Sequence, residues 1–387
     1  MSLCSLPTAF SFPTESLSSK SDPVSLPGLS FPPFLRLPKT LTLTAFSAPQ
    51  QRVIHQSSIE TESDPEPAFA EVTAFAPATI ANLGPGFDFL GCAVDGMGDS
   101  VTLKIDPETP PGRLAITSIH GDPKKKLSLN PNFNCAGIAA IATMKMLGIR
   151  SCGLSLSLHK GLPLGSGLGS SAASAAAGAL AVNHLFGNRL PVSDLVLAGL
   201  ESEATVSGYH ADNIAPALVG GFVLVQTYAP LTLISLPFPA DKDLFFVLAA
   251  PEFEAPTKKM RAALPDEITM KDHVANCSQA GALVAGVLQG DARVLGLAMS
   301  SDTLVEPRRK GLIPGMAEVK EAAVEAGAYG CTISGAGPTA VAVTDFEERG
   351  QEIGRAMVEA FLKGGKLRAN ASVHKLDRVG ARVLTTS

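Results

Sequence analysis

The sequence predicts an α+β fold, and three observations support this class. Residues 154–158 alternate leucine and serine, which is typical of a half-buried strand. A glycine-rich turn at 165–169 follows, and the alanine-rich stretch from Ser170 to Phe186 then favours a helix that begins near Ser170. The remaining strand and helix patterns lack regular β–α alternation, which argues against a doubly wound parallel sheet.

The other elements expected follow in chain order. Apolar periodicity predicts helices over 193–206, 275–288, 291–299, 315–326 and 348–363. Strands are expected at 222–225 and 244–248, on both sides of the turn at 334–338, and within 371–384. No internal repeat at a fixed period is visible.

The first fifty residues differ from the rest in composition. They are crowded with Ser, Thr and Pro, and their only acidic residues are Glu15 and Asp22. No apolar core of a secretory signal is present, so residues 1–50 are predicted to be an organellar transit peptide rather than a tail without an address. The weak basic content favours plastids over mitochondria. Residues 51–69 read as a linker, and we expect nothing before residue 69 to pack on the body that follows.

Composition excludes several classes of protein. The chain has 387 residues, of which 45% are hydrophobic and 17% charged, and its net charge is −5. This supports a sizeable core and gives no indication of a nucleic-acid or membrane partner. No run of apolar residues is long enough to span a bilayer. The six cysteines form no C-x-x-C pair, which argues against a structural zinc site or a disulfide framework and fits a reducing compartment.

The strongest local signal is a glycine-rich segment between the strand and the alanine-rich helix. It reads Pro163, Leu164, Gly165, Ser166, Gly167, Leu168, Gly169, Ser170, Ser171, Ala172, Ala173 and Ser174. Alternate glycines let the backbone approach a ligand closely, and the start of a helix offers free N–H groups to a phosphate. The Ser170 and Ser171 hydroxyls can bind a phosphate oxygen or Mg²⁺. The alternative is a flexible linker before a core helix. The spacing is neither that of a Walker A loop nor that of a dinucleotide fingerprint.

Two further loops are weaker signals by themselves. In residues 76–91, Asn82 and Asp88 bracket a Gly-Pro-Gly turn, so both can face one small polar ligand, or the segment is only a structural turn. Residues 334–339 read equally well as a hairpin turn or as a loop that contacts a ligand.

Together, and in this order, the three segments resemble the three motifs of the GHMP kinases, a superfamily of small-molecule kinases. The resemblance extends from about Val72 to the C-terminus. It implies a two-lobed fold with an N-terminal ATP-binding domain over 70–235 and a C-terminal α/β domain over 236–387. It also implies ATP and Mg²⁺ as cofactors, and a third motif, 334–339, that supports the ATP loop.

Within the superfamily, residues 76–88 resemble the first motif of the homoserine kinases. The Gly-Glu-His element of galactokinases and mevalonate kinases is absent near this point, and the segments 207–216 and 306–315 agree with homoserine kinases. The resemblance implies ATP-dependent phosphorylation of L-homoserine to O-phospho-L-homoserine in threonine biosynthesis. The transit-like leader adds the chloroplast stroma as the expected location. Two alternatives remain open: another GHMP kinase with a sugar or mevalonate-like substrate, and an inactive family member that senses a ligand.

The resemblance also implies residue roles. Arg261 and Arg309 correspond to a clamp on the substrate carboxylate, for which the guanidinium fork is suited. Arg308 competes with Arg309 for this assignment. Asp88 corresponds to the partner of the ammonium group. The hydroxyl contacts and the lining of the same pocket are assigned to Asn82, His210 and Asn213.

Phosphoryl transfer adds a metal requirement. Glu203 corresponds to the Mg²⁺ ligand, with Ser171 or Ser170 as its partner, and Glu201 is the competing carboxylate. Asp212 is a tempting catalytic base, but we interpret it as structural, because phosphoryl transfer depends mostly on positioning and electrostatics. The partners expected are small molecules, homoserine and ATP. The sequence does not specify the assembly, and a homodimer stays open.

Overall fold

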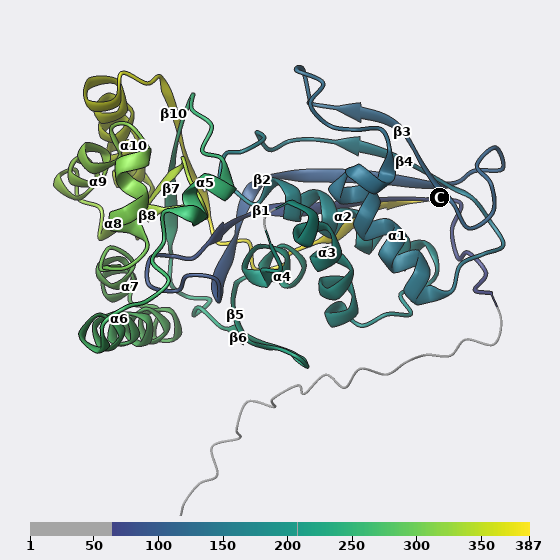
Figure 1. The fold of residues 1–387 in the computed structure, drawn as a ribbon, viewed down its shortest axis with the longest axis horizontal. Helices are drawn as coiled ribbons and strands as arrows, with labels where there is room; N and C mark the ends of the chain where they lie inside the picture. Colours follow the sequence, from purple (N-terminus) through teal and green to yellow (C-terminus); the bar gives the residue numbers. More distant parts are fainter. Residues whose placement is uncertain (1–63, 207) are drawn as a thin grey trace, which may run out of the picture. The chain divides into compact units, whose positions relative to one another are not determined.

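A computed structural model describes residues 64–206 and 208–387 of the chain. The predicted transit peptide and most of the predicted linker lie outside the described residues. The described part contains two β-sheets with helices packed on them (Figure 1), which confirms the α+β class. No helix in this part of the chain is both long enough and apolar enough to cross a bilayer.

The first sheet has seven strands. A path of five neighbouring strands runs β11-β1-β2-β4-β3, and the hairpin of β5 and β6 joins it through β2. The strands are β1 (Glu71–Ala81), β2 (Leu90–Ile105), β3 (Leu114–His120), β4 (Leu154–His159), β5 (Phe222–Tyr228), β6 (Leu231–Leu236) and β11 (Arg382–Thr386). Among the described strands of this sheet, β3 and β4 pair in parallel and the other pairs are antiparallel.

Four helices form the layer next to this sheet: α1 (Cys135–Leu147), α2 (Ser170–Leu185), α3 (Val192–Val206) and α4 (Ala211–Val219). α2 and α4 contact β1 and β2 directly, while α1 and α3 pack on α2 (Figure 1). The alanines of α2 are buried, and their small side chains let the helix lie close to the strands. The glycine-rich loop at the start of α2 is therefore held against the sheet.

The second sheet is antiparallel, in the order β10-β7-β9-β8. Its strands are β7 (Phe245–Pro251), β8 (Gly330–Ile333), β9 (Ala340–Thr344) and β10 (Ala369–Lys375). It contacts α7 (Ala292–Met299), α9 (Met316–Glu325) and α10 (Glu347–Ala360), and α6 (Met270–Gln289) packs on α7. Two short helices, α5 (Thr257–Ala262) and α8 (Glu306–Arg309), carry the arginines predicted for the site. Single turns of tighter or wider helix cover Pro131–Phe133, Lys310–Leu312 and Phe361–Gly365.

Strand β7 connects the cores of the two sheets. Phe246 and Leu248 belong to the core that fills the first sheet, whereas Val247 and Ala249 belong to the core beneath α9 and α10. Because side chains alternate along a strand, one strand supplies both cores. Burial of both faces of β7 explains why 244–248 is an uninterrupted apolar run. The shared strand also holds the two sheets together.

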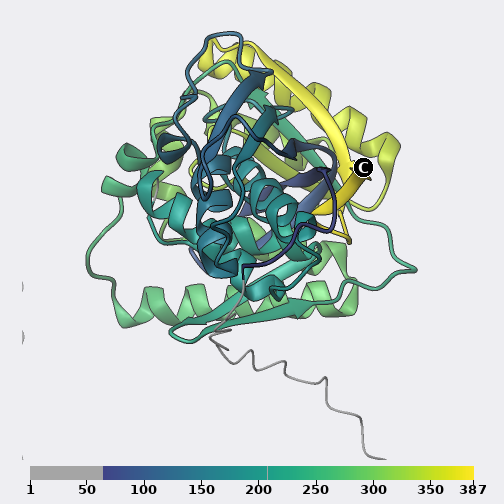
Figure 2. The same cartoon turned by 90° about the vertical axis from the view of Figure 1, so that its right-hand side faces the viewer.

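The predicted elements that depend on local pattern are confirmed, with ends shifted by a few residues. The helix expected over 275–288 begins five residues earlier, after the N-cap of Thr269. Within the predicted strand region 371–384 the structure has two strands, and β11 pairs with β1 in the first sheet (Figures 1 and 2). The predicted division at 235/236 assigns β11 to the C-terminal domain, although β11 pairs with β1 of the N-terminal domain. The division itself stays a prediction.

The expectation that nothing before residue 69 packs on the body is wrong. The Asp64 carboxylate accepts a hydrogen bond from the Arg150 amide at 2.9 Å, and Pro65 is buried. The Ala68 amide donates to the Leu185 carbonyl at 2.8 Å. Composition marked these residues as linker, but the contacts they make come from distant parts of the chain.

Candidate active site

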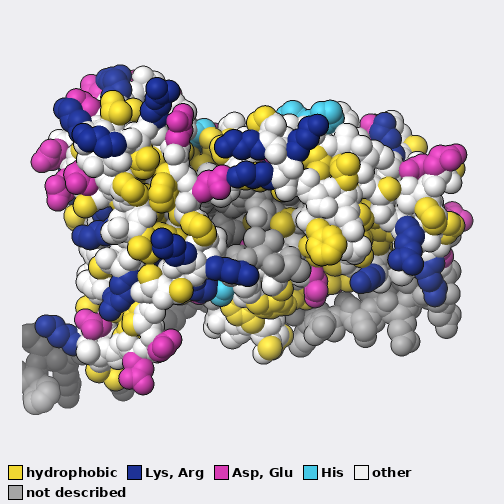
Figure 3. Space-filling view, turned by 45° about the horizontal axis from the view of Figure 1, so that its top comes forward, with side chains coloured by type: hydrophobic (Ala, Val, Ile, Leu, Met, Phe, Trp, Pro, Cys, Tyr) yellow, Lys and Arg dark blue, Asp and Glu magenta, His cyan; other side chains and the backbone are white. Residues whose placement is uncertain are grey.

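One cavity brings most of the predicted site residues together. Its volume is about 820 Å³ with the open solvent at its mouth included. The predicted residues that line it are Asn82, Asp88, Gly165, Ser166, Gly167, Gly169, Ser170, Ser171, Ala172, Glu203, His210, Asn213, Arg261 and Arg309. Those that do not are Pro163, Leu164, Leu168, Ala173 and Ser174. Lys and Arg side chains gather around the hollow on this face (Figure 3).

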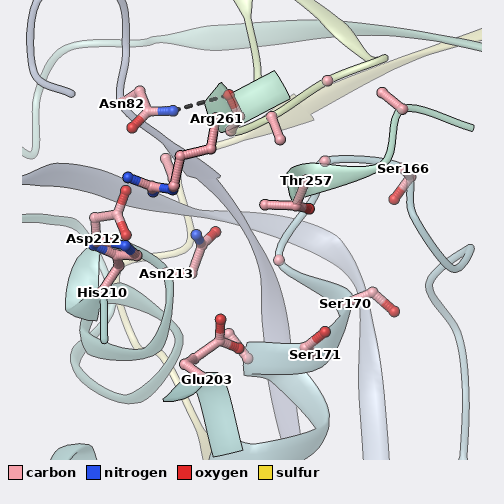
Figure 4. A pocket seen from close by; sticks show the side chains of 18 of the residues that line it. Asn82, Ser166, Ser170, Ser171, Glu203, His210, Asp212, Asn213, Thr257 and Arg261 are labelled. Carbon is pink, nitrogen blue, oxygen red and sulfur yellow. Dashed lines mark hydrogen bonds between the residues drawn. The ribbon is translucent and has the colours of Figure 1, made fainter. Parts of the chain in front are cut away.

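The cavity has two chemically different ends. Figure 4 shows Ser166, Ser170 and Ser171 towards one side, and Arg261, Asp212 and His210 towards the other. The first group comes from the glycine-rich loop and the start of α2, the second from α5 and the start of α4. The distribution places hydroxyls, free backbone N–H groups and the Glu203 carboxylate at one end, and the Arg261, Asp212 and His210 side chains at the other.

The glycine-rich loop needs its glycines. Gly165, Gly167 and Gly169 have φ values of +67°, +80° and +65°, which side chains other than glycine rarely adopt. Gly169 is the N-cap of α2, so the helix begins at Ser170 as expected. The Ser170 hydroxyl does not cap the helix, however; it donates to the Leu162 carbonyl at 3.4 Å. The first amides of α2 remain available at the cavity.

The third motif supports this loop from the second sheet. Residues 334–339 form the turn between β8 and β9, which agrees with the hairpin interpretation, and Gly335, Ala336 and Gly337 line the cavity. The Ser334 hydroxyl donates to the Gly167 carbonyl at 2.6 Å, and the Thr339 amide donates to the Ser166 carbonyl at 3.3 Å. The loop is thus held by a hairpin that is far away in sequence.

Strand β1 supports the loop from the first sheet through Thr79, a residue that sequence analysis missed. Its amide donates to the Leu168 carbonyl at 3.1 Å, and its hydroxyl donates to Asn213 Oδ1 at 2.8 Å. A side chain at Gly169 would lie only 1.9 Å from the Thr79 hydroxyl oxygen. In the sequence, Thr79 stands among alanines and other apolar residues, which was the available signal. The structure buries it fully, and a buried hydroxyl needs a partner.

At the charged end, Asp88 and Arg261 form a bidentate ion pair. Both carboxylate oxygens accept hydrogen bonds at 2.8 Å, and His210 Nδ1 lies 3.6 Å from Asp88 Oδ2. Phe87, which was not predicted, lies under both arginines, with the guanidinium carbons of Arg261 and Arg309 at 5.2 Å and 4.9 Å from its ring centroid. Cation–π contact with one ring keeps the two cations near each other.

Arg309 lies deeper than Arg261. It is 2% exposed and donates to the Gly335 carbonyl at 2.9 Å and to the Met260 carbonyl at 3.3 Å. Arg308, the competing residue, is exposed and bonds the carbonyl of Leu304 in the preceding turn. Only Arg309 of the two lines the cavity.

Asn82 ties the first motif to the third. Its side-chain nitrogen donates to the Gly335 carbonyl at 2.9 Å, and its oxygen accepts from the Asp88 amide at 3.1 Å. Asn82 and Asp88 have φ values of +72° and +64°, and asparagine and aspartate are among the residues that tolerate this conformation best. One amide hydrogen of Asn82 remains for a ligand.

Burial changes the charge state of the groups in the cavity. It raises the pKa of Asp212 to about 7, with help from the nearby Asp88 and Glu203. It lowers the pKa of His210, against the opposing effect of Asp88, so this imidazole is neutral near pH 7. Burial and the neighbouring Arg261 lower the pKa of Arg309 to about 10, which still leaves it charged.

At the end of the cavity formed by the glycine-rich loop and the start of α2, the residues suit a hard cation. Glu203 and Ser171 both line the cavity, and Glu203 is 6% exposed, whereas Glu201 faces solvent. A carboxylate and hydroxyls are oxygen donors of the kind that Mg²⁺ prefers, and this ion usually keeps waters and phosphate oxygens as its other ligands. The donor set therefore fits the predicted metal.

Comparison with known proteins agrees with this geometry. The family model for the GHMP kinases N terminal domain matches residues 134–221, and that for GHMP kinases C terminal matches residues 279–363. A homoserine kinase of Arabidopsis thaliana is 70% identical over 84% of this chain and 87% of its own length. A homoserine kinase of Chlorobium phaeovibrioides is 43% identical over 81% of this chain and 99% of its own.

A solved structure gives the same result in three dimensions. The crystal structure of homoserine kinase from Cytophaga hutchinsonii superposes with a TM-score of 0.76 at 42% identity, covering 82% of this chain and 99% of that one. Identity at this level over nearly whole relatives goes beyond a shared fold. The chain belongs to the homoserine kinase family of the GHMP kinases.

Proposed function

We propose that this protein transfers the γ-phosphoryl group of ATP to the side-chain hydroxyl of L-homoserine, giving O-phospho-L-homoserine for threonine biosynthesis. The observation that carries the proposal is the two-ended cavity. A phosphate-type loop lies at one end, and a carboxylate with two guanidinium groups lies at the other. A zwitterion with a hydroxyl and a nucleotide can meet between them.

The Asp88–Arg261 pair explains selectivity for an amino acid. Homoserine offers a carboxylate to Arg261 and Arg309 and an ammonium group to Asp88, so each member of the pair gains a new partner as it gives up the old one. Mevalonate has a carboxylate but no ammonium, and it would leave Asp88 without a counter-charge. A neutral sugar offers neither group. Leaving Asp88 as a partly buried, unpaired charge disfavours mevalonate, and a sugar is disfavoured because it has no charged group to exchange with the Asp88–Arg261 pair.

The substrate hydroxyl is positioned by neutral groups. Asn213 Oδ1 accepts from Thr79, which leaves the amide nitrogen of Asn213 to donate to the hydroxyl oxygen. His210 is neutral and can accept or donate one hydrogen bond there. Asn82 contributes its remaining amide hydrogen. Phosphoryl transfer with a loose transition state asks mainly for alignment, so no dedicated base is assigned.

The nucleotide binds at the other end. The amides of the glycine-rich loop and of the first turn of α2 contact the phosphates, with the Ser170 and Ser171 hydroxyls beside them. Glu203 and Ser171 would hold Mg²⁺, which when bound would neutralise charge on the phosphates. Gly167 and Gly169 keep the loop packed against the third motif and Thr79, because a Cβ there would lie 2.6 Å from the Ser334 carbonyl oxygen or 1.9 Å from the Thr79 hydroxyl oxygen.

Turnover with a substrate panel tests the proposal. The purified protein is given MgATP with L-homoserine, mevalonate or galactose, and ADP release and the phosphorylated product are measured. We expect turnover with homoserine alone. Turnover with mevalonate or galactose would support the first alternative, and ATP binding without turnover of any substrate would support the ligand sensor.

We further propose that residues 1–50 direct the protein to chloroplasts. The Ser/Thr-rich, acid-poor composition supports this, as does a close relative from a plant. Residues 1–63 fused to a fluorescent reporter should accumulate in the plastids of leaf cells. A purely cytosolic signal would contradict the proposal without affecting the catalytic one.

A further inference from the structure

A buried ion pair lies directly behind the glycine-rich loop and takes no part in the chemistry described above. Lys160 follows β4, and Asp99 lies in β2. Their side chains are 2% and 0% exposed, and the Lys160 ammonium contacts Asp99 Oδ2. Neither residue lines the cavity.

The alternation of both strands places these charges inside. In β4, every second residue from Leu154 to Leu158 is buried, and Lys160 is the next position of this alternation. In β2, Asp99 occupies the same face as the buried Val101 and Leu103. A charge at a core position of a strand requires a partner, and this was the signal in the sequence. Neither segment alone identifies the partner, because the pairing is between strands.

The pair bonds to both ends of the loop. At the entry, Asp99 Oδ1 accepts from the amides of Gly161 and Leu162 at 3.0 Å and 3.2 Å. At the exit, the Lys160 ammonium donates to the Ser170 carbonyl at 2.9 Å.

Ser174 closes the network one turn into α2. Its hydroxyl accepts from the Lys160 ammonium at 2.8 Å and donates to Asp99 Oδ2 at 2.7 Å. The three ammonium hydrogens thus have three acceptors, and the carboxylate has four donors. A fully satisfied buried network of this kind has one arrangement of its members.

We propose that Lys160 and Asp99 are positioning residues for ATP. They set the distance and orientation between the two ends of the loop, so that its amides and those of α2 converge on the phosphates before the nucleotide binds. This inference rests on the proposed kinase function. Burying an ion pair rarely stabilises a fold more than apolar residues would, so net stability does not explain the pair, whereas loop geometry does.

Three variants separate positioning from stability. Asp99→Asn and Lys160→Met each leave a buried charge without its partner, so both should lower Tm. The double variant Asp99→Asn/Lys160→Met removes both charges and should recover much of that loss. In all three the KM for ATP should rise by about tenfold or more, while the KM for homoserine stays near the wild-type value. We therefore expect the double variant to recover much of the lost Tm while its KM for ATP stays raised.

A matched control exists in the connection between β10 and β11. Asp377 is 5% exposed, accepts from the amides of Val379 and Gly380 at 2.9 Å and 2.8 Å, and pairs with Arg382 at 2.9 Å. It repeats the bonding pattern of Asp99 away from the cavity. Asp377→Asn should lower Tm and leave the KM for ATP unchanged. If the charge variants prove insoluble, Ser174→Ala removes the neutral member of the network and should raise the KM for ATP several-fold.

The outcomes distinguish this inference from the kinase proposal. ATP binding by wild-type protein is measured by calorimetry together with homoserine turnover. If wild type fails in both, the proposed function is wrong and this inference falls with it. If wild type succeeds and the double variant recovers ATP affinity together with Tm, or Ser174→Ala binds ATP normally, the pair is only structural and the inference alone is overturned.

Discussion

Asp88 and Arg261 neutralise each other, and each can pair with the opposite charge of a zwitterionic substrate. Removing either residue should therefore change the binding of homoserine and not that of ATP. Arg261→Ala should lower kcat/KM for homoserine by roughly two orders of magnitude, from a loss of about 3 kcal/mol of bidentate bonding. Most of the effect should appear in the KM for homoserine, with the KM for ATP unchanged. Arg261→Lys should restore activity only in part, because an ammonium lacks the fork. Steady-state kinetics with both substrates checks this.

Arg309 should behave differently, because it also bonds the Gly335 carbonyl of the third motif. Arg309→Ala should raise the KM for homoserine and, by loosening residues 334–339 behind the glycine-rich loop, the KM for ATP as well. Arg308→Ala is the matched control, since Arg308 is exposed and outside the cavity. Equal effects of the Arg308 and Arg309 substitutions on either KM would contradict the assignment.

Asp212 should make stability depend on pH. Its pKa is raised from 3.8 to about 7, so the folded protein retains a proton that the unfolded chain has lost. The free energy of unfolding therefore falls as the pH rises through this window, and the loss is complete above the folded pKa. Asp212→Asn removes the titration. The Tm of this variant relative to wild type should be clearly higher at about pH 8 than at about pH 5. A Tm difference independent of pH would contradict a buried, neutral-preferring Asp212, and retained turnover would support its structural role.

At the scale of elements, sequence could predict what local pattern determines. The strand at 154–158, the turn and the helix after Ser170 follow one another in the chain, and each pattern agrees with the next. Strands β1 and β2 were missed because alanines, glycines and a proline give little alternation, although both strands are central to the sheet.

The site shows the same limit. Family resemblance indicated the charged residues, but the Asp88–Arg261 pairing, Phe87 beneath two arginines and the Thr79–Asn213 bond all join residues more than a hundred positions apart. Such contacts depend on topology, which no local pattern encodes. They are also the contacts that decide which lone pairs and hydrogens remain for a ligand.

The close packing of Gly169 gives a prediction for the loop. Gly169→Ala would place a methyl group 1.9 Å from the Thr79 hydroxyl oxygen, so the loop must move, and kcat/KM for ATP should fall by more than about tenfold. Gly221→Ala is the control, because its φ of +64° matches the +65° of Gly169 while nothing lies within 4 Å of the new methyl. Both substitutions should lower Tm through backbone strain. Unchanged ATP kinetics in Gly169→Ala would show that the loop tolerates displacement.

For the molecule as a whole, the catalytic body begins earlier than composition suggested. A chain starting at Ala70 loses the Asp64–Arg150 and Ala68–Leu185 bonds and the stacking of Phe69 on His184. It should be less stable by about 2–3 kcal/mol than a chain starting at Asp64, with turnover at low temperature retained. Denaturant unfolding of the two chains checks this. Equal stability would mean that these contacts contribute nothing measurable.

The pairing of β11 with β1 has a consequence for biosynthesis. During translation β1 leaves the ribosome early, but the strand that covers its outer edge is made only after the whole second sheet. Until then β1 presents unpaired amides and carbonyls of the kind that recruit other chains. A nascent polypeptide therefore passes through a long interval in which its first sheet is incomplete, and holding chaperones have their natural point of action there.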